Sequence, residues 1–219
     1  MILAAGRGER MGAGRNKALL ELAGRPLLLH SLETFRAICD RVLMVAAEED
    51  VAVIEQLLPD LQVVTGGNTR QGSERNALQE LRSSVSVDHV LAFHDAARPL
   101  VAPDDVQAVF VEAERLGAAM LGAAAKQPAL LVRGGGVRGT YEARQIWRAQ
   151  TPQAARASWL LAAYDRAAAD GFDGTDTAAV LARAGYTVRV VPATVANPKI
   201  TIRADLTLAE QVLQARISQ

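Results

Sequence analysis

The chain has little of several residue types on which whole classes of protein depend. It holds one cysteine, Cys39, in 219 residues, which excludes an intrachain disulfide and a cysteine-based metal cluster. Its three histidines, His30, His89 and His94, do not have the spacing of metal ligands. No apolar run approaches the roughly 18 residues of a membrane-spanning helix, and no signal peptide is visible. We therefore expect a cytoplasmic protein in a reducing compartment.

An excess of charge of one sign is also lacking. Lysine plus arginine and aspartate plus glutamate each number 24, so the chain has no overall basic field of the kind that nucleic-acid-binding proteins carry. Any anion site must come from local clustering. Hydrophobic residues make up 50% of the chain, which is enough for a substantial core. We expect residues 1–219 to form one domain, from which residues 126–150 project as an arm.

Short β-rich runs alternate with longer helical segments along the chain. The expected strands cover residues 2–4, 41–46, 62–65, 89–94, 118–123 and 187–192. The expected helices cover residues 26–38, 51–58, 72–81, 104–116, 157–169, 177–184 and 204–216. Strands such as 42–46 are apolar on both faces, which is typical of a mostly parallel sheet covered by helices. The predicted fold class is α/β and Rossmann-like, with helices on both faces of the sheet.

Residues 126–150 break this alternation. Two short β-rich segments flank Gly134-Gly135-Gly136 and predict a hairpin. A projecting hairpin seldom buries enough core to stand alone. We therefore expect the arm to pack against a second subunit.

The first expected strand is short. It has only about four residues, fewer than the usual five or six, although the first strand of a doubly wound fold is usually central. We therefore hypothesise that the native chain begins upstream of Met1, which intact-mass analysis of protein from the native host would test.

A glycine-spaced, cationic loop follows the first expected strand. It contains Gly6-x-Gly8, with Arg10 and Lys17 seven residues apart. Small residues let backbone N–H groups approach an anion, and the two cations can neutralise phosphate charge. The loop lacks the third glycine of a dinucleotide-binding fingerprint and the Gly-Lys-Ser/Thr end of a P-loop. It therefore predicts a phosphate site of another kind.

Two further loops should meet the first, because the carboxyl ends of parallel strands gather at one edge of a sheet. Residues 66–73 include several small and hydroxyl-bearing residues and suit either a phosphate or ribose site or a turn with an N-cap. Asp95 and Arg98 follow the strand 89–94 and suit either a Mg²⁺ ligand beside a substrate surface or a salt bridge in a turn. His94 is interpreted as structural. Lys199 is either a second phosphate cation or a surface lysine.

Taken together, these residues resemble the 2-C-methyl-D-erythritol 4-phosphate cytidylyltransferases. The motifs are Ala4-Ala5-Gly6-x-Gly8-x-Arg10-Met11 with Lys17, Gly66-Gly67-x-x-Arg70-x-x-Ser73, His94-Asp95-Ala96-Ala97-Arg98-Pro99, Gln150-Thr151-Pro152-Gln153, Thr175-Asp176 and Asn197-x-Lys199. The resemblance covers nearly the whole chain. It implies transfer of CMP from CTP to a polyol phosphate, with Mg²⁺ as cofactor and a homodimer formed through the arm.

The resemblance also implies a role for each matching residue. Arg10 and Lys17 would stabilise the transition state. The residues that would line the nucleotide site are Ala4, Ala5, Gly6, Gly8, Gly67, Asn68, Ser73 and Ala96. Asp95 would serve both the metal and the acceptor. The other acceptor-binding residues would be Arg98, Arg144, Thr175 and Lys199. Thr175 or its neighbour Asp176 also suits the N-cap of the helix that follows.

The chain departs from the family pattern in the acceptor half of the site. Pro128 stands where the family has a threonine that contacts the acceptor phosphate, and Ala143 stands where it has an arginine. Arg144, one residue later, is expected to replace that arginine. Two alternatives stay open on these departures. The expected acceptor is 2-C-methyl-D-erythritol 4-phosphate, and the alternatives are a cytidylyltransferase for another polyol phosphate, such as ribitol 5-phosphate, or a non-catalytic nucleotide-binding homologue.

Overall fold

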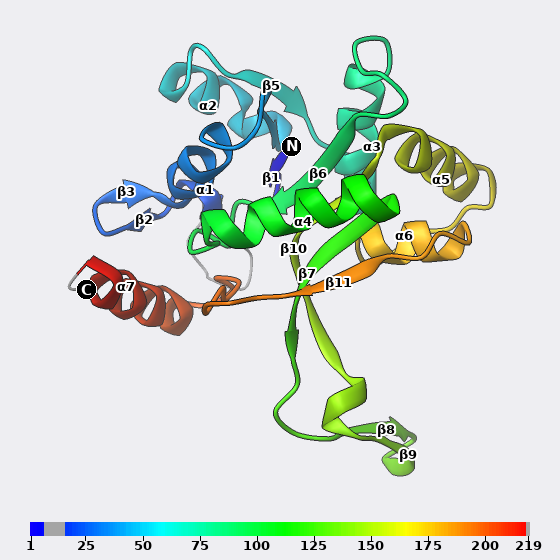
Figure 1. Ribbon diagram of the computed structural model, residues 1–219. Helices are drawn as coiled ribbons and strands as arrows, with labels where there is room; N and C mark the ends of the chain where they lie inside the picture. Colours follow the sequence, from blue (N-terminus) through cyan, green and yellow to red (C-terminus); the bar gives the residue numbers. More distant parts are fainter. Residues whose placement is uncertain (7–15, 218–219) are drawn as a thin grey trace.

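A mostly parallel seven-stranded sheet forms the centre of the molecule (Figure 1). The computed structural model describes residues 1–6 and 16–217. The strand order is β11-β7-β10-β6-β1-β4-β5. These strands are β1 (Ile2–Ala4), β4 (Leu43–Ala46), β5 (Gln62–Thr65), β6 (Val90–Asp95), β7 (Ala118–Ala124), β10 (Trp147–Arg156) and β11 (Arg189–Pro192). Only β10 runs antiparallel to its neighbours β6 and β7 among these described strands. The predicted α/β class is confirmed.

Helices cover both faces of the sheet. They are α1 (Leu27–Arg36), α2 (Val51–Leu57), α3 (Arg70–Leu81), α4 (Pro103–Leu116), α5 (Ala157–Ala169) and α6 (Thr177–Arg183), whereas α7 (Arg203–Ile217) packs against Leu22, Leu27 and Leu100 beside the sheet. Successive residues of a strand point to opposite faces. Met44 and Ala46 accordingly pack with α1, α2 and α4, whereas Leu43 and Val45 pack with α3, α5 and α6. None of the helices in the described part of the chain has the length and apolar character needed to cross a bilayer.

The predicted segment boundaries agree closely with the structure in most places. The strands 2–4 and 62–65 and the helix 157–169 are confirmed to the residue, and most other boundaries differ by one or two positions. The small hairpin of β2 (Glu21–Leu22) and β3 (Arg25–Pro26) was not predicted. The short 3₁₀ turns η2 (Lys17–Leu19), η3 (Glu48–Asp50) and η4 (Ala143–Gln145) connect larger elements.

The largest correction concerns β10, which was not predicted. Its residues include Pro152 and several long polar side chains, a composition that argues against a central strand. In the structure the strand changes register against β7 between Ala149 and Gln153, and this irregularity accommodates the proline. Strand β10 begins within the predicted arm 126–150 and continues from it into the central sheet.

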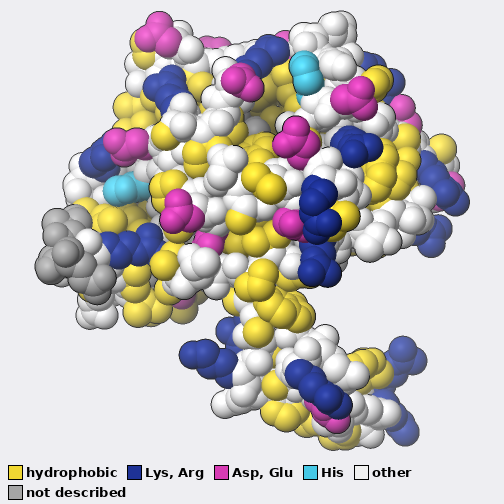
Figure 2. All heavy atoms as spheres, viewed as in Figure 1, with side chains coloured by type: hydrophobic (Ala, Val, Ile, Leu, Met, Phe, Trp, Pro, Cys, Tyr) yellow, Lys and Arg dark blue, Asp and Glu magenta, His cyan; other side chains and the backbone are white. Residues whose placement is uncertain are grey.

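The projecting arm contains the predicted hairpin. It is formed by β8 (Ala129–Arg133) and β9 (Gly136–Tyr141), which pair antiparallel. Gly134 and Gly135 at its tip have φ angles of 57° and 76°, a region that glycine adopts without strain. The hairpin lies well away from the body and is joined to it by the extended ends of β7 and β10 (Figure 1). Figure 2 shows basic and hydrophobic side chains on this small lobe.

Strand β1 is short but central, as predicted for the first strand. Ile2 lies opposite Met44 of β4 on one side and His94 of β6 on the other. Both neighbouring strands extend further toward the amino-terminal end of β1. A cavity of about 470 Å³ opens beside Met1 at this end, and the Met1 amino group donates a hydrogen bond to the Ala92 carbonyl at 2.8 Å. This edge is opposite the one at which the predicted site loops lie.

Candidate active site

The three predicted loops meet at the carboxyl edge of the sheet. They enclose a cavity of about 280 Å³. Its lining residues are Leu3, Ala5, Gly6, Lys17, Gly67, Asn68, Thr69, Arg70, Ser73, Asp95, Ala97 and Lys199. The convergence of loops after β1, β5 and β6 is therefore confirmed. Arg10 and Gly8 lie outside the described residues, so their roles stay predictions.

Lys17 is positioned by the buried side chain of Asn16. The Asn16 amide donates to the Ala4 carbonyl and, at 2.7 Å, to an oxygen of Asp50. Its Oδ1 accepts from the Ala18 N–H at 2.9 Å and so caps the 3₁₀ turn η2 that begins at Lys17. The Lys17 side chain lies against Gly6, where an added Cβ would be 3.5 Å from Lys17 Cε. Asn16 thus ties the base of the cationic side chain to the end of β1.

The second loop is packed tightly against the start of α3. A Cβ on Gly67 would lie 2.8 Å from the backbone of Gly72, so only glycine fits there. Thr69 caps the helix by accepting from the Gly72 N–H at 2.9 Å. The Ser73 hydroxyl accepts from the Gly67 N–H at 3.0 Å. The turn and N-cap interpretation is therefore correct for Thr69, and Ser73 shapes the loop from within.

Asp95 lies among three cations. Lys199 Nζ is 2.7 Å from Asp95 Oδ2, Arg98 Nε is 3.7 Å from the same oxygen, and Arg70 Nε is 3.5 Å from Oδ1. Burial alone would raise the pKa of Asp95, but Lys199, Arg70 and Arg98 together hold it well below its ordinary value. The predicted salt bridge between Asp95 and Arg98 is present, and it is one of three. Asp95 is consequently ionised throughout the neutral range.

The surroundings of Asp95 do not fit the predicted Mg²⁺ ligand. Both carboxylate oxygens already face cations, and a divalent ion placed on them would be repelled by Lys199, Arg70 and Arg98. Among residues 1–6 and 16–217 there is no cluster of three or more His, Cys, Asp or Glu side chains that could hold a metal. Asp95 instead fits a group that orders neighbouring cations and accepts hydrogen bonds from hydroxyls.

His94 is structural, as the sequence indicates. It is fully buried beside Phe35. Its Nε2 is 3.2 Å from the Arg98 carbonyl oxygen, and its Nδ1 is 3.1 Å from the Thr151 hydroxyl, which also accepts from the Asp95 N–H. These partners are satisfied when neutral His94 donates through Nε2 and accepts at Nδ1. Burial lowers the pKa of His94 to about 3.

We predict that His94 makes stability depend on pH. In the unfolded chain histidine has a pKa of about 6.5, whereas in the folded chain the pKa of His94 is about 3. Between these values only the unfolded state binds the proton, so the free energy of unfolding falls as pH falls, by up to about 1.4 kcal/mol per pH unit. Urea unfolding of wild type and His94→Gln between pH 7 and pH 4.5 measures this. The prediction is contradicted if the free energy of unfolding changes with pH in the same way in wild type and in His94→Gln. The control is His89→Gln, which replaces an exposed histidine.

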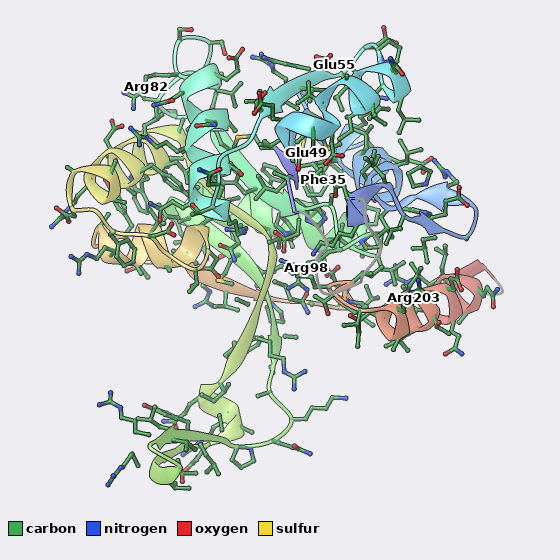
Figure 3. The ribbon with its side chains drawn as sticks, turned by 180° about the vertical axis from the view of Figure 1, so that it is seen from behind. Phe35, Glu49, Glu55, Arg82, Arg98 and Arg203 are labelled. Carbon is green, nitrogen blue, oxygen red and sulfur yellow. The ribbon has the colours of Figure 1, made fainter. Side chains whose placement is uncertain are left out.

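Arg98 connects the site to the base of the arm. Besides facing Asp95, it donates from Nη1 to the Asn197 carbonyl at 2.8 Å and from Nη2 to the Ala149 carbonyl at 3.2 Å. The buried Asn197 amide in turn donates to Gln150 Oε1 and to the Thr151 carbonyl. Figure 3 shows Arg98 where the body meets the arm. The Asp95 side of the cavity and the base of the arm are therefore held in one hydrogen-bonded unit.

Several predicted site residues lie elsewhere in this chain. The Ala4 and Ala96 side chains are buried in the core beneath the cavity. Thr175 is exposed and does not line the cavity, and its neighbour Asp176 caps α6 by accepting from the Ala179 N–H. The Arg144 side chain is 80% exposed on the arm, where it pairs with Glu142. Arg144 does not enter the cavity of its own chain.

Several residues that build the site had no role predicted from the sequence. Arg70 and Thr151 stand within the motifs but carried no assignment, and Asn197 was noted only as a neighbour of Lys199. Glu74, which pairs with Arg70, gave no signal because a glutamate on a helix is ordinarily solvated. The presence of Arg70 and Thr151 in the family motifs could therefore have identified them as site residues.

Comparisons with known proteins point in one direction. The profile of the 2-C-methyl-D-erythritol 4-phosphate cytidylyltransferase family matches residues 1–215. Proteins with that name from Lysinibacillus sphaericus and Thermosynechococcus vestitus are 36% and 38% identical to this chain. The first match covers 99% of this chain and 95% of the relative, and the second covers 100% and 96%.

Solved structures are similar along nearly the whole chain. The crystal structure of 2-C-methyl-D-erythritol 4-phosphate cytidylyltransferase from Thermus thermophilus is 28% identical, with a TM-score of 0.80. It covers 97% of this chain and 98% of its own. The structure of the Francisella tularensis protein of the same name is also 28% identical, with a TM-score of 0.82 and coverage of 96% and 97%.

Proposed function

The chain belongs to the 2-C-methyl-D-erythritol 4-phosphate cytidylyltransferase family, and we propose that it transfers CMP from CTP to 2-C-methyl-D-erythritol 4-phosphate with release of pyrophosphate. The observation that carries this proposal is that two sets of residues from different loops line one cavity. Gly6, Lys17 and Gly67 are one set, and Asp95 with Arg70 and Lys199 is the other. Two anionic substrates can thus meet between separate sets of positive groups.

The proposed reaction needs positioning and charge neutralisation more than proton transfer. An oxygen of the acceptor phosphate attacks the α-phosphorus of CTP, and the bond from that phosphorus to the β-phosphate oxygen breaks. Since the attacking oxygen is already anionic, no general base is required. His94, which is buried and neutral, is not suited to be one. We propose that Lys17 stabilises the negative charge that builds up around the α-phosphorus. By resemblance, Arg10 has the same role.

The acceptor half suits a polyol phosphate. Lys199 supplies a cation for the phosphate, and its ammonium is held at 2.7 Å from Asp95. Asp95 stays ionised and can accept hydrogen bonds from polyol hydroxyls. Arg98 orients Asp95 and at the same time holds Ala149 at the arm base. We therefore assign Asp95, Arg98 and Lys199 to the acceptor.

Two further features belong to the same proposal. Mg²⁺ commonly binds through substrate phosphates with few protein carboxylates, and we propose that it accompanies CTP rather than binding to Asp95. A cytoplasmic location is proposed because the reaction consumes CTP and the single Cys39 requires no oxidising compartment.

We also propose a homodimer in which each arm completes the site of its partner. The arm exposes a set of large hydrophobic residues that nothing in the described chain covers, namely Leu130, Leu131, Val132, Val137, Tyr141 and Trp147. Exposed apolar groups gathered on a small lobe are typical of an interaction surface. Arg144 lies in η4 on the same lobe and is not among the residues that line the cavity of its own chain. In a dimer it becomes available to the acceptor phosphate of the other subunit.

Replacing Arg144 by alanine is expected to lower kcat/KM for the acceptor by about 10- to 100-fold, because a charged hydrogen bond to phosphate is lost. The KM for CTP should change little. Initial rates with the acceptor varied at saturating CTP measure this effect. Arg115→Ala is the matched control, since Arg115 also pairs with a nearby glutamate, Glu112, but on the body surface. An unchanged kcat/KM in Arg144→Ala would reject its role.

The proposed reaction is tested by measuring pyrophosphate release from each of the four nucleoside triphosphates with a panel of polyol phosphates. We expect the highest kcat/KM with CTP and 2-C-methyl-D-erythritol 4-phosphate. Pro128 and Ala143 are the specific reason to include ribitol 5-phosphate in the panel. A higher kcat/KM with ribitol 5-phosphate would identify that compound as the acceptor instead. If no combination of nucleotide and polyol phosphate released pyrophosphate, a non-catalytic binding protein would be favoured.

A further inference from the structure

A carboxylate is buried where three helices pack together beside the cavity. Glu74 of α3 is 0% exposed. The Tyr164 hydroxyl of α5 donates to one of its oxygens, and the Thr177 hydroxyl at the start of α6 donates to the other at 2.7 Å. Burial raises the pKa of the Glu74 carboxyl, an effect that Arg70 and the two hydroxyls oppose. Burying an apolar residue here would cost less free energy than burying a carboxylate.

Arg70 connects this buried carboxylate to the cavity. Its Nη1 donates to Glu74 Oε1 and lies 3.5 Å from Thr177 Oγ1, while its Nε lies 3.5 Å from Asp95 Oδ1. Its Nη2 is buried and has no hydrogen-bond partner among the described residues. Buried donors are rarely left unpaired. The position of the guanidinium is therefore set by its contacts with Glu74 and Asp95, and one of its nitrogens is left without a hydrogen bond.

The contact with Arg70 fixes one oxygen of Asp95. Oδ1 faces Arg70, whereas Oδ2 faces Lys199 and Arg98. Cations on both oxygens restrict rotation of the carboxylate about its last side-chain bond. The direction in which Asp95 presents its lone pairs to an acceptor hydroxyl, and the position of Lys199, both depend on this restraint.

We propose that Glu74 is a positioning residue for the acceptor half of the site. It acts through Arg70, which it holds against Asp95, and Tyr164 and Thr177 keep Glu74 itself in place. This inference rests on the proposed function, because Asp95 and Lys199 are assigned there to the acceptor. Glu74 does not line the cavity and touches no substrate. Its effect on the reaction is therefore indirect and should be confined to the acceptor.

The test is Glu74→Gln, which keeps the size of the side chain and removes its charge. We expect kcat/KM for 2-C-methyl-D-erythritol 4-phosphate to fall about tenfold, with less than a twofold change in the KM for CTP. Asp165→Asn is the matched control. Asp165 of α5 pairs with Arg82 just beyond α3, so it joins the same two helices at an exposed position. Figure 3 shows Arg82 at the end of α3 away from Arg98.

A double-mutant cycle separates positioning from general loss of stability. If Glu74 acts through Arg70, the double variant Arg70→Lys with Glu74→Gln should lose no more acceptor kcat/KM than Arg70→Lys alone. Tyr164→Phe removes one donor to Glu74 without changing charge and should lower the same parameter in the same direction by a smaller factor. It keeps the test decisive if Glu74→Gln does not fold.

Three outcomes would overturn the inference. They are wild-type acceptor kinetics in Glu74→Gln, equal losses for CTP and the acceptor, and additive losses in the double-mutant cycle. The activity of the wild-type enzyme shows whether the proposed function itself is wrong or only the role of Glu74. If wild type does not turn over CTP with 2-C-methyl-D-erythritol 4-phosphate, the proposed function is wrong. If it does and Glu74→Gln matches it, only the positioning role is wrong.

Discussion

Replacing Lys17 by methionine is expected to lower kcat for CMP transfer by about 10²- to 10³-fold, because one preorganised positive group is removed from the place where charge develops. Lys17 begins a short turn that Asn16 caps and anchors to Ala4 and Asp50. The backbone from which the Lys17 side chain extends is therefore held in place. A methionine keeps the unbranched side chain as far as the Cε position, which is the atom that lies against Gly6, and removes only the ammonium group.

Single-turnover and steady-state rates at saturating substrates measure the Lys17 effect. The Kd for CTP should rise by a smaller factor than kcat falls, since the charge around the α-phosphorus is greatest in the transition state. Lys17→Arg keeps the charge and should recover part of kcat. A Lys17→Met enzyme with the kcat of wild type would show that the lysine does not stabilise the transition state.

Replacing Asp95 by asparagine is expected to lower kcat/KM for the acceptor at least about 100-fold and to destabilise the fold by about 3 kcal/mol. The substitution keeps the shape of the side chain but leaves Lys199, Arg70 and Arg98 without their shared counter-charge. Mutual repulsion then displaces Lys199 from the position that the acceptor phosphate requires. Binding of CTP should persist, because the cavity becomes more positive.

Urea unfolding and initial rates with the acceptor varied measure the two effects of Asp95→Asn. Asp105→Asn is the control. Asp105 is also buried, but it accepts from the N–H and hydroxyl of Thr194, away from the cavity. It should lose stability with little change in acceptor kcat/KM. The account of Asp95 is contradicted if Asp95→Asn loses stability alone.

The sequence predicted the fold well wherever the strands are short and apolar on both faces. Residues 42–46 are an example, because a strand covered by helices on both sides needs hydrophobic residues at every position, and Leu43–Ala46 are all buried. Once such strands are taken as parallel, the meeting of their carboxyl ends follows from topology. The position of Lys17, Gly67 and Asp95 around one cavity was therefore predictable from the sequence.

Features set by long-range packing were not predictable in the same way. Strand β10 is rich in alanine and glutamine, and its place in the sheet depends on β6 and β7 rather than on its own side chains. The surroundings of Asp95 could not be read from its neighbours in sequence, because Arg70 and Lys199 come from distant segments. The burial of Glu74 depends on Tyr164 and Thr177, which are 90 and 103 residues away.

The departures of this chain from the family pattern gather on the arm rather than at the cavity. Lys17 and Gly67 stand at the cavity, as the resemblance implies. Pro128 and Ala143 stand on the arm, where this chain departs from the family pattern, and Arg144 is exposed beside them. The identity of the acceptor is therefore the most informative quantity to measure.

The most direct test of the central claim is identification of the products formed from CTP and 2-C-methyl-D-erythritol 4-phosphate in the presence of Mg²⁺. Mass spectrometry and phosphorus NMR should reveal 4-diphosphocytidyl-2-C-methyl-D-erythritol and pyrophosphate in equal amounts, with neither formed when enzyme is omitted. Persistence of both substrates under these conditions, with conversion of CTP only when a different polyol phosphate is supplied, would contradict the account.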